Sequence, residues 1–230
     1  MFKVSIIVPT FNEEKTIGQC ILQTYEVLNH SGLEYEIIVV DDGSKDETFK
    51  IVKNIASSIK AIKLIKHERN LGKGEAIKTG LNVASGDIIC IIDADLEYSP
   101  KDILSLINPI IEGKANIVYG SRFLKNNRMN FFRRFGNILL TNIANILYNL
   151  KLTDIMTGSK AFKKEILKGI LLNSKSFEFE IEVTLKLTRN NYRIMEVPIS
   201  YNRRKAGKSK LSWIDGLKFL FFIFQYKIKR

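Results

Sequence analysis

The first 122 residues alternate short apolar runs with helical segments, and no other feature of the chain limits its fold as strongly. Runs rich in Val and Ile predict β-strands over residues 3–9, 35–42, 61–67, 87–93 and 115–122. Segments with helical periodicity separate these runs, so each strand is followed by a helix. Repeated βα units of this kind predict an α/β fold, in which helices cover both faces of a mostly parallel sheet.

Acidic residues follow two of the predicted strands at the point where each strand ends. Asp41 and Asp42 close the second run, and Asp93, Asp95 and Glu97 follow the fourth in "IIDADLE". In sheets of this class, ligands bind outside the carboxyl ends of the strands. These carboxylates therefore mark the expected binding site.

The three acids of "IIDADLE" repel one another, and each favours protonation of the others. Either they are spread over a solvated turn, or a cation lies among them. Carboxylate oxygens suit Mg²⁺ or Mn²⁺, and Mg²⁺ is usually held by one or two carboxylates together with substrate phosphates. Asp93, Asp95 and Glu97 are therefore the predicted metal ligands, and the metal would neutralise a diphosphate leaving group.

The earlier acid pair stands in "VVDDGSKDET", where Gly43 permits a tight turn. An Asp side chain just past a strand can hydrogen-bond the edge of a nucleotide base or the hydroxyl groups of a ribose. The alternative is that Asp42 or Asp46 only caps the next helix. Both roles are compatible, with Asp46 as the cap and Asp41 as the ligand. Asn12 is predicted to cap the first helix.

Charge is distributed unevenly along the chain, whose net charge is +12. Residues 1–120 carry 13 Lys and Arg against 17 Asp and Glu, a net of −4, whereas residues 121–230 carry 23 against 7, a net of +16. A strongly basic segment implies an anionic partner, namely nucleic acid, anionic lipid or phosphate groups. Nucleic acid is rejected, because the basic residues are interleaved with Phe, Leu and Ile and form no recognisable recognition module.

Two segments of the basic half, about residues 128–150 and 212–228, combine basic and bulky apolar residues at helical spacing. They are predicted to be amphipathic helices at a membrane interface, and the alternative is that they pack on the sheet as ordinary helices. No apolar run approaches the ~20 residues of a membrane span, and the N-terminus lacks the layout of a signal peptide. Cys20 and Cys90 stand in apolar surroundings, as expected in a reducing compartment. We therefore expect a peripheral protein on the cytoplasmic face of a membrane.

The blocks "SIIVPTFNEE", "VVDDGSKDET", "NLGKGEAIKTG" and "IIDADLE" occur in the order and with the spacing of a known family. The chain resembles the family-two glycosyltransferases of GT-A fold, which transfer sugars from nucleotide-diphosphate donors with inversion. Later blocks, among them "TDIMTGSKAF" and "YRIMEVPISY", are similar to those of the polyprenyl-phosphate hexose synthases, above all the dolichyl-phosphate mannose synthases. The resemblance covers nearly the whole chain and implies one domain over residues 1–230. Residues 1–122 would form its nucleotide-sugar half and residues 123–230 its acceptor half.

The resemblance also implies roles for individual residues. The nucleotide would be bound by residues of the first half: Pro9, Phe11, Glu13, Asp41 and Asp42. The donor diphosphate and the metal would be held by Asp93, Asp95 and Glu97, although the mannose synthases carry Gln where this chain has Glu97. Ser159 departs from the aromatic residue that is common at its position, so the resemblance does not define this wall of the sugar or acceptor site.

Arg122, Arg133 and Arg204 match arginines that the family uses for acceptor or donor phosphates, with Lys210 assisting. Guanidinium groups bind phosphate oxygens through two parallel hydrogen bonds. Together with Asp95, these three arginines are the predicted catalytic residues. For Arg133 and Arg134 the alternative is attraction to anionic lipid without a role in the reaction.

A phosphate acceptor makes the expected mechanism simple. A phosphate monoester has a second pKa near ~6 and is largely dianionic at neutral pH, so it needs no general base, unlike a sugar hydroxyl. We expect a single displacement with inversion, driven by positioning and electrostatics. If the acceptor were a hydroxyl group, Asp154 in "TDIMTG" would be the candidate base.

The resemblance predicts a metal-dependent enzyme that moves mannose from GDP-mannose to dolichyl phosphate or another polyprenyl phosphate. UDP-glucose is the alternative donor, because the related glucose synthases share most of these blocks. A hydroxyl acceptor is a second alternative, although the Q/R-x-x-R-W motif common in that class is absent and the single Trp213 lies in "KLSWID". Many relatives carry C-terminal transmembrane helices, so a separate membrane-anchoring subunit is conceivable as a partner.

Overall fold

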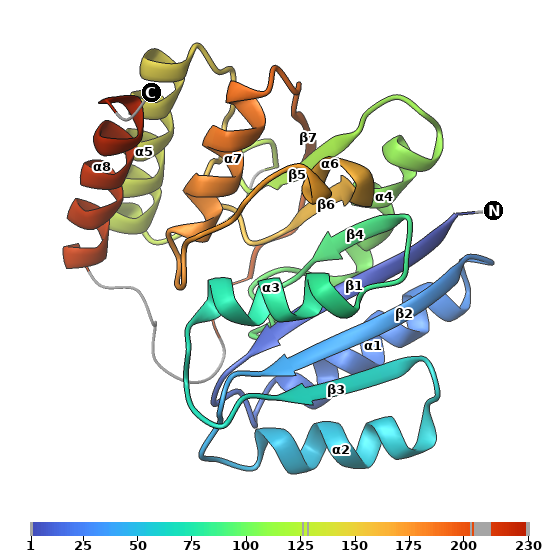
Figure 1. Ribbon diagram of the computed structural model, residues 1–230. Helices are drawn as coiled ribbons and strands as arrows, with labels where there is room; N and C mark the ends of the chain where they lie inside the picture. Colours follow the sequence, from blue (N-terminus) through green and yellow to red (C-terminus); the bar gives the residue numbers. More distant parts are fainter. Residues whose placement is uncertain (1, 126, 128, 203, 205–212, 229–230) are drawn as a thin grey trace.

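The computed structural model describes residues 2–125, 127, 129–202, 204 and 213–228. Within them, seven strands form one sheet with the order β3-β2-β1-β4-β6-β5-β7 (Figure 1). The strands are β1 Lys3–Thr10, β2 Glu34–Asp41, β3 Ile62–Lys66, β4 Ile88–Ile91, β5 Ile117–Ser121, β6 Lys160–Lys163 and β7 Met195–Pro198. Only the two pairings that involve β6 are antiparallel. The predicted mostly parallel α/β sheet is confirmed.

Helices cover both faces of this sheet. They are α1 Ile17–Asn29, α2 Thr48–Ser58, α3 Lys73–Val83, α4 Ile103–Ile111 (after the 3₁₀ turn η1 Pro100–Asp102), α5 Phe131–Tyr148, α6 Lys164–Lys168, α7 Phe179–Arg189 and α8 Trp213–Ile228. Helices α1, α2 and α4 pack against one face, in a core that includes Ile6 and Val8. Helices α3, α6 and α7 pack against the other face, around Ile7 and Ile38. Neighbouring residues of β1 thus enter opposite cores, which is why the strand is apolar throughout.

Helices α5 and α8 form a further layer, which packs on α7 and not on the sheet (Figure 1). The three helices share one buried apolar cluster, which includes Leu140, Ala144, Ile181, Leu185, Phe219 and Ile223. The two helices agree in position with those predicted over residues 128–150 and 212–228. Among the helices described, none combines the length and the apolar character that crossing a membrane requires.

Strand β6 is absent from the strands predicted from the sequence. Its four residues have a lysine at each end, Lys160 and Lys163, so they lack the apolar run that marks the other strands. The strand lies between β4 and β5 and pairs antiparallel with both. Strands from both halves of the chain therefore complete one sheet, and the division into a donor half and an acceptor half remains a prediction.

The first helix begins later than predicted, and Asn12 does not cap it. Helix α1 starts at Ile17, whereas Asn12 has a left-handed backbone conformation with φ 50°. The Asn12 N–H donates to Ser44 Oγ (2.9 Å), and Asn12 Oδ1 accepts from Lys45 N–H (2.8 Å). The prediction is therefore wrong, because a contact between two loops has taken the place of a local cap.

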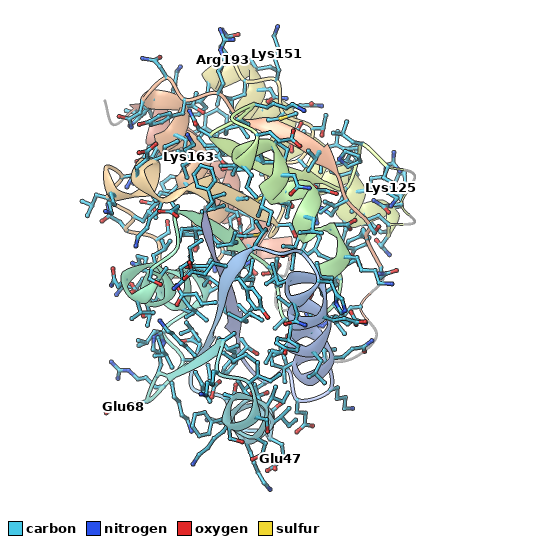
Figure 2. All side chains as sticks on the ribbon, turned by 90° about the vertical axis from the view of Figure 1, so that its right-hand side faces the viewer. Glu47, Glu68, Lys125, Lys151, Lys163 and Arg193 are labelled. Atoms are coloured by element: carbon cyan, nitrogen blue, oxygen red, sulfur yellow. The ribbon has the colours of Figure 1, made fainter. Side chains whose placement is uncertain are left out.

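Charged side chains are exposed at both ends of the molecule. The exposed residues Glu47 and Glu68 lie at the end formed by α2 and β3, whereas the exposed Lys151 and Arg193 lie at the opposite end (Figure 2). Lys151 and Arg193 stand in the loops that follow α5 and α7. The end formed by α2 and β3 also exposes Lys50, Lys53 and Lys66, so the uneven charge of the sequence does not divide the molecule into an acidic and a basic end.

Candidate active site

A cavity of about 680 Å³ lies at the carboxyl ends of β1 and β4 and extends to helices α5 and α8. Ten of the twelve residues predicted for the site line it: Pro9, Phe11, Glu13, Asp42, Asp93, Asp95, Glu97, Arg122, Arg133 and Arg204. Asp41 is fully buried and is not part of the lining, and Lys210 lies outside the described residues. The carboxyl ends of parallel strands meet at one edge of the sheet, which is why residues far apart in sequence share this cavity.

Asp42 organises the loop that leads into α3. Its Oδ1 accepts from Leu71 N–H (2.9 Å) and its Oδ2 from Gly72 N–H (2.8 Å). His67 Nδ1 lies 2.7 Å from the same Oδ1. Asp42 therefore shapes the wall of the cavity through this loop and does not cap α2. Asp46 serves that helix instead, because its Oδ1 accepts the first N–H of α2 at 3.0 Å.

Asp41 is buried at the end of β2 with one oxygen unsatisfied. Its Oδ1 accepts from Ser44 N–H (3.0 Å), whereas Oδ2 has no hydrogen-bond partner among the described residues. Thr10 pairs with Asp41 across β1 and β2, and its buried Oγ1 likewise has no hydrogen-bond partner among the described residues. Buried polar atoms are nearly always hydrogen-bonded, so this pair is chemically suited to a ligand that both donates and accepts.

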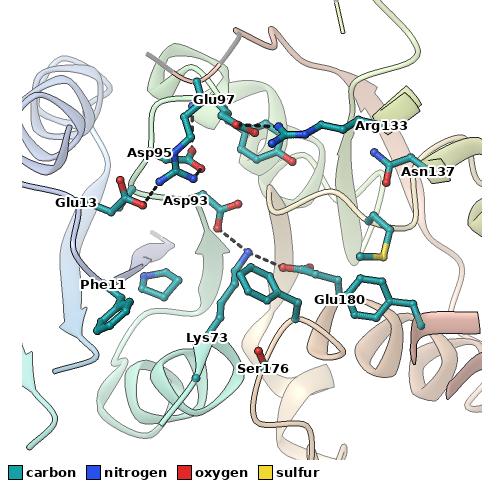
Figure 3. A pocket seen from close by; sticks show the side chains of 18 of the residues that line it. Phe11, Glu13, Lys73, Asp93, Asp95, Glu97, Arg133, Asn137, Ser176 and Glu180 are labelled. Atoms are coloured by element: carbon teal, nitrogen blue, oxygen red, sulfur yellow. Dashed lines mark hydrogen bonds and ion pairs between the residues drawn. The ribbon is translucent and has the colours of Figure 1, made fainter. Parts of the chain in front are cut away.

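The first two acids of the turn after β4 pair with cations from distant segments (Figure 3). Asp93 Oδ1 lies 2.6 Å from Lys73 Nζ at the start of α3. Asp95 Oδ2 lies 3.3 Å from Arg204 Nη1, and Arg204 also forms an ion pair with Glu13. In this structure, therefore, the side chains of Lys73 and Arg204 supply the positive charge that offsets the repulsion between the two acids.

Glu97, the third acid, is paired with a different part of the site. Its Oε1 lies 3.4 Å from Arg133 Nη1 on α5, and its Oε2 accepts from Tyr201 OH (3.3 Å). The preceding Leu96 has a left-handed backbone with φ 60°, which is uncommon for a bulky residue and sharpens the turn. Glu97 thus joins the acid turn to the first turn of α5, and its role as a metal ligand remains a prediction.

The chemistry of the acid turn fits a divalent cation. Burial, together with the charges of Asp93 and Glu97, raises the pKa of Asp95 to about 7, so the ionised carboxylates destabilise one another. In the part of the chain that the structure describes, no three acidic, His or Cys side chains converge closely enough to hold a metal. The residues present fit a site of two carboxylates, Asp93 and Asp95, completed by oxygens of a bound diphosphate.

Arg122 is buried and already bound to a carboxylate. Its Nε and Nη2 each lie 2.6 Å from an oxygen of Asp154, which is fully buried. The rings of Tyr98 and Tyr201 lie 5.8 and 5.9 Å from the guanidinium carbon. Burial alone would lower the pKa of Arg122, but Asp154 outweighs this effect and raises it. Since one guanidinium holds both oxygens of Asp154, this acid orients Arg122, and its alternative role as a general base remains untested.

Several lining residues carry no prediction from the sequence, among them Lys73, Tyr98, Asn137, Ser176, Phe177 and Glu180. They stand in helices and loops whose local pattern is ordinary, so only packing reveals them. Gly158 in "TGSKAF" is a further residue without a prediction, and its lack of a side chain is the signal that could have identified it. A Cβ at this position would collide with the Asp93 carboxylate, so only glycine allows the segment to lie against the acid turn.

The cavity changes character along its length. Towards α5 and α8 its lining is apolar and includes Met129, Phe132, Leu140, Met156, Phe177 and Phe219. Phe132 is 81% exposed, and its neighbours Phe131 and Phe135 are exposed as well. The cavity therefore has a charged end, at the carboxyl ends of β1 and β4, and an apolar end, which reaches an exposed apolar surface on α5.

Comparison with known proteins gives a consistent result. The family model described as glycosyl transferase family 2 matches residues 5–171. The chain is 32% identical over 230 residues to a dolichol-phosphate mannosyltransferase of Pyrococcus furiosus, which covers 97% of this chain and 63% of that protein. It is 36% identical over 219 residues to a UDP-N-acetylglucosamine–dolichyl-phosphate N-acetylglucosaminyltransferase of Methanococcus voltae, with 85% and 84% covered. The chain thus spans less than two thirds of the length of the Pyrococcus relative.

A solved structure of glucosyl-3-phosphoglycerate synthase from Mycobacterium tuberculosis, in complex with Mn²⁺, UDP and phosphoglyceric acid, matches with a TM-score of 0.76. The identity is 22% over 99% of this chain and 79% of that one, so this likeness concerns the fold alone. The family model, in contrast, covers well over half of the chain, and both relatives exceed 30% identity. The chain belongs to glycosyl transferase family 2.

Proposed function

We propose that this protein transfers a hexose, with inversion, from a nucleoside-diphosphate sugar to the phosphate of a polyprenyl lipid such as dolichyl phosphate. The observation that carries the proposal is the cavity, whose charged end holds acids and arginines and whose apolar end reaches the exposed surface of α5. Such a site fits two ligands, of which one is a diphosphate and the other a phosphate on an apolar chain. Two relatives named for transfer to dolichol phosphate or dolichyl phosphate support it.

The charge of the lining supports a divalent cation in the bound state. Among the described residues, six acidic and four basic side chains line the cavity, an excess of two negative charges when all are ionised. A diphosphate and a phosphate dianion would meet net repulsion there, and Mg²⁺ or Mn²⁺ held by Asp93 and Asp95 would offset it and neutralise the leaving group. Solved structures of the same fold contain Mn²⁺ or Mg²⁺ with UDP.

In the proposed reaction, the acceptor phosphate attacks the anomeric carbon as the nucleoside diphosphate departs. A bond from a phosphate oxygen to that carbon forms while the bond from the carbon to the diphosphate breaks. No proton has to be removed, because the acceptor phosphate, with a second pKa of about 6, is largely dianionic at neutral pH. Arg122, Arg133 and Arg204 line the cavity and would hold the phosphates, so the protein contributes positioning and electrostatic stabilisation.

For the donor we propose GDP-mannose, with UDP-glucose as the alternative. Asp41 Oδ2 and Thr10 Oγ1, which lack partners among the described residues, would supply an acceptor and a donor to the edge of the base. The Pyrococcus relative is named for mannose transfer, whereas the Methanococcus relative is named for UDP-N-acetylglucosamine. Similarity therefore supports the acceptor class more strongly than the sugar.

A donor panel tests this function. Purified protein, a short polyprenyl phosphate and Mg²⁺ or Mn²⁺ are offered GDP-mannose, UDP-glucose, UDP-galactose and UDP-N-acetylglucosamine, and the glycolipid product is detected by mass spectrometry. Product from GDP-mannose alone would confirm the whole proposal. Product from a UDP-sugar alone would keep the acceptor and make the mannose proposal wrong. Folded protein that forms no product with any donor would contradict the proposed reaction for this chain without a partner subunit.

We further propose that α5 and α8 rest on the cytoplasmic surface of the membrane that carries the acceptor. Exposed apolar side chains recur along both helices: Phe131, Phe132, Phe135, Ile138, Leu139 and Ile146 on α5, and Leu217, Phe221, Phe224 and Ile228 on α8. Arg133 and Arg134 are exposed in the first turns of α5. Apolar surface next to basic residues is typical of helices that bind the headgroup region. Cys20 and Cys90 are free and buried, as in a reducing compartment.

Replacing both Phe135 and Phe221 with Ser should weaken binding to anionic liposomes by about 30- to 1,000-fold, because each ring loses roughly 1 to 2 kcal/mol of apolar burial in lipid. Neither residue lines the cavity, so turnover of a short water-soluble acceptor should stay at the wild-type rate. Liposome co-sedimentation measures the binding, and Leu22→Ser, at an exposed position of α1, is the matched control. Unchanged binding by the double variant would contradict this docking surface.

A further inference from the structure

Four charged residues from four segments form a chain of ion pairs along one side of the cavity, and Figure 3 labels three of them, Lys73, Asp93 and Glu180. Lys160 of β6 pairs with Glu180 of α7. Glu180 Oε1 lies 2.8 Å from Lys73 Nζ on α3, and the same Nζ lies 2.6 Å from Asp93 Oδ1. Lys73, Glu180 and Asp93 line the cavity, whereas Lys160 is fully buried and is not part of the lining.

Burying this chain of charged residues is costly for the stability of the fold. Lys160 is 0% exposed and Glu180 is 3% exposed. Burial lowers the pKa of Lys160, and the pairing with Glu180 offsets only part of this effect. Removing charges from water is costly, and replacing buried ion pairs with apolar residues is often neutral or stabilising. A role in ligand binding accounts for the arrangement better than a role in folding.

One oxygen of Glu180 is left for a ligand. Its Oε1 is buried and ion-paired with Lys73 Nζ at 2.8 Å, and a carboxylate oxygen has a second lone pair that can accept a further hydrogen bond. The other oxygen is taken by Lys160, which also donates to a backbone carbonyl and so cannot swing away. On the lining of a cavity, such an oxygen can accept from a ligand hydroxyl beside Lys73.

The position of this oxygen indicates which part of the donor it would meet. In Figure 3, Phe11 and Glu13 lie on one side of Asp93 and Glu180 lies on the other, while Lys73 reaches Asp93 from below. Phe177, from the loop before α7, adds an aromatic ring whose centroid lies 5.8 Å from Lys73 Nζ. A hydroxyl-rich group attached to the diphosphate would therefore meet a carboxylate, an ammonium and an apolar ring in this part of the cavity.

We propose that Lys73 and Glu180 recognise the hydroxyl groups of the donor hexose, and that Lys160 is a positioning residue that holds Glu180. The proposal rests on the proposed function, because it requires that the ligand of the acid turn is a nucleotide sugar. The carboxylate accepts from a hydroxyl and the ammonium donates to one, so together they distinguish hexoses by where their hydroxyl groups point. A site built to hydrogen-bond a hydroxyl strongly rejects an analogue that lacks it.

The test compares nucleotide sugars with the corresponding free nucleotides, and it needs no acceptor. Calorimetry with Mn²⁺ measures the affinities of GDP-mannose, UDP-glucose, GDP and UDP for wild type and for Glu180→Gln. We expect the affinity for the recognised nucleotide sugar to fall by about 10- to 100-fold, since a hydrogen bond to a charged group is lost. The affinity for the free nucleotide should stay within about twofold, because no contact to the sugar contributes to it.

Monodeoxy donors identify the hydroxyl that is recognised. In wild type, removal of one particular hydroxyl should cost about as much affinity as Glu180→Gln, and in the variant the same removal should cost nothing further. If Lys160 positions Glu180, Lys160→Met should likewise make removal of that hydroxyl cost no affinity. The affinity for the free nucleotide should be retained. This pattern separates positioning from a general loss of structure. Glu178→Gln, an identical change nearby that does not line the cavity, should leave every affinity unchanged.

Two results would overturn the proposal. One is that Glu180→Gln lowers the affinities for free nucleotide and for nucleotide sugar equally. The other is that removal of each hydroxyl costs as much affinity in Glu180→Gln as in wild type. If Glu180→Gln does not fold, the coupling with the deoxy donors is measured in Lys73→Gln, at a less buried position with 11% of its side chain exposed. Coupled deoxy effects without transfer to polyprenyl phosphate would uphold this proposal and refute the proposed acceptor. Wild type that binds no nucleotide sugar would refute both.

Discussion

Replacing Asp95 with Asn is expected to lower the rate of hexose transfer by about 10²- to 10³-fold, the usual effect of removing one group that stabilises charge in a transition state. Asp95 lines the charged end of the cavity and lies beside Asp93 and Glu97. The residues present fit a metal site in which Asp95 supplies one of two carboxylates. Its loss would therefore weaken binding of the cation and leave the charge of the diphosphate less neutralised.

The same substitution should not destabilise the metal-free protein at alkaline pH. Burial and the neighbouring acids raise the pKa of Asp95 from 3.8 to about 7, so ionisation of this carboxyl is harder in the folded than in the unfolded chain. Its destabilising effect is absent at low pH, grows between about pH 4 and about pH 7, and is complete above that range. The unfolding temperature of Asp95→Asn relative to wild type should therefore rise across this range.

Thermal unfolding with a chelator, and transfer assays with Mn²⁺, measure the two effects of Asp95→Asn separately. Mn²⁺ should raise the unfolding temperature of wild type by more than that of the variant. Asp87→Asn is a control, because Asp87 bonds the backbone of Lys3 and lies outside the cavity lining. A transfer rate of Asp95→Asn within about tenfold of wild type would contradict the assignment of the acid turn to the diphosphate and its metal.

Replacing Asp154 with Asn should destabilise the protein by about 3 to 5 kcal/mol, because it leaves the buried guanidinium of Arg122 without its carboxylate. Both oxygens of Asp154 bond Arg122 at 2.6 Å, and neither residue is more than 8% exposed. The rate of transfer should fall as well, by about 10²-fold, since Arg122 would no longer be held towards the phosphates. Urea unfolding and the transfer assay measure the two losses.

A second variant separates this role from that of a general base. Combining Arg122→Met with Asp154→Leu should recover most of the lost stability, since an apolar pair often replaces a buried ion pair without cost. It should remain inactive, because the guanidinium is gone. A general base would instead give Asp154→Asn a large loss of rate with wild-type stability. That outcome would favour a hydroxyl acceptor and contradict the phosphate mechanism.

The strands and the location of the site follow from local properties of the sequence. The apolar runs predicted over residues 3–9 and 35–42 correspond to β1 at Lys3–Thr10 and β2 at Glu34–Asp41. A buried parallel strand must be apolar on both faces, so it is visible in any short window of sequence. Because the carboxyl ends of such strands meet, the acids that follow them fall into one cavity without further information.

Other features had no local signal. Strand β6 has lysines at both ends, and it is a strand only because β4 and β5 lie on either side of it. Asn12 is a residue type that often caps helices, but its N–H donates to Ser44, 32 residues away in a different loop. In both cases a contact with a distant segment outweighs the local preference, and such contacts are invisible in a short window of sequence.

The sequence by itself determined the fold class, the family and the edge of the sheet at which the acids and arginines gather. Only the tertiary structure decided which residue forms an ion pair with each of these acids and arginines. Arg204 reaches Glu13 across 191 positions of the chain, Arg122 is committed to Asp154, and Lys160 holds Glu180. Ion pairs depend on distance and burial, which no spacing in the sequence encodes, whereas the apolar runs of the strands and the helical periodicity can be read in short stretches of sequence.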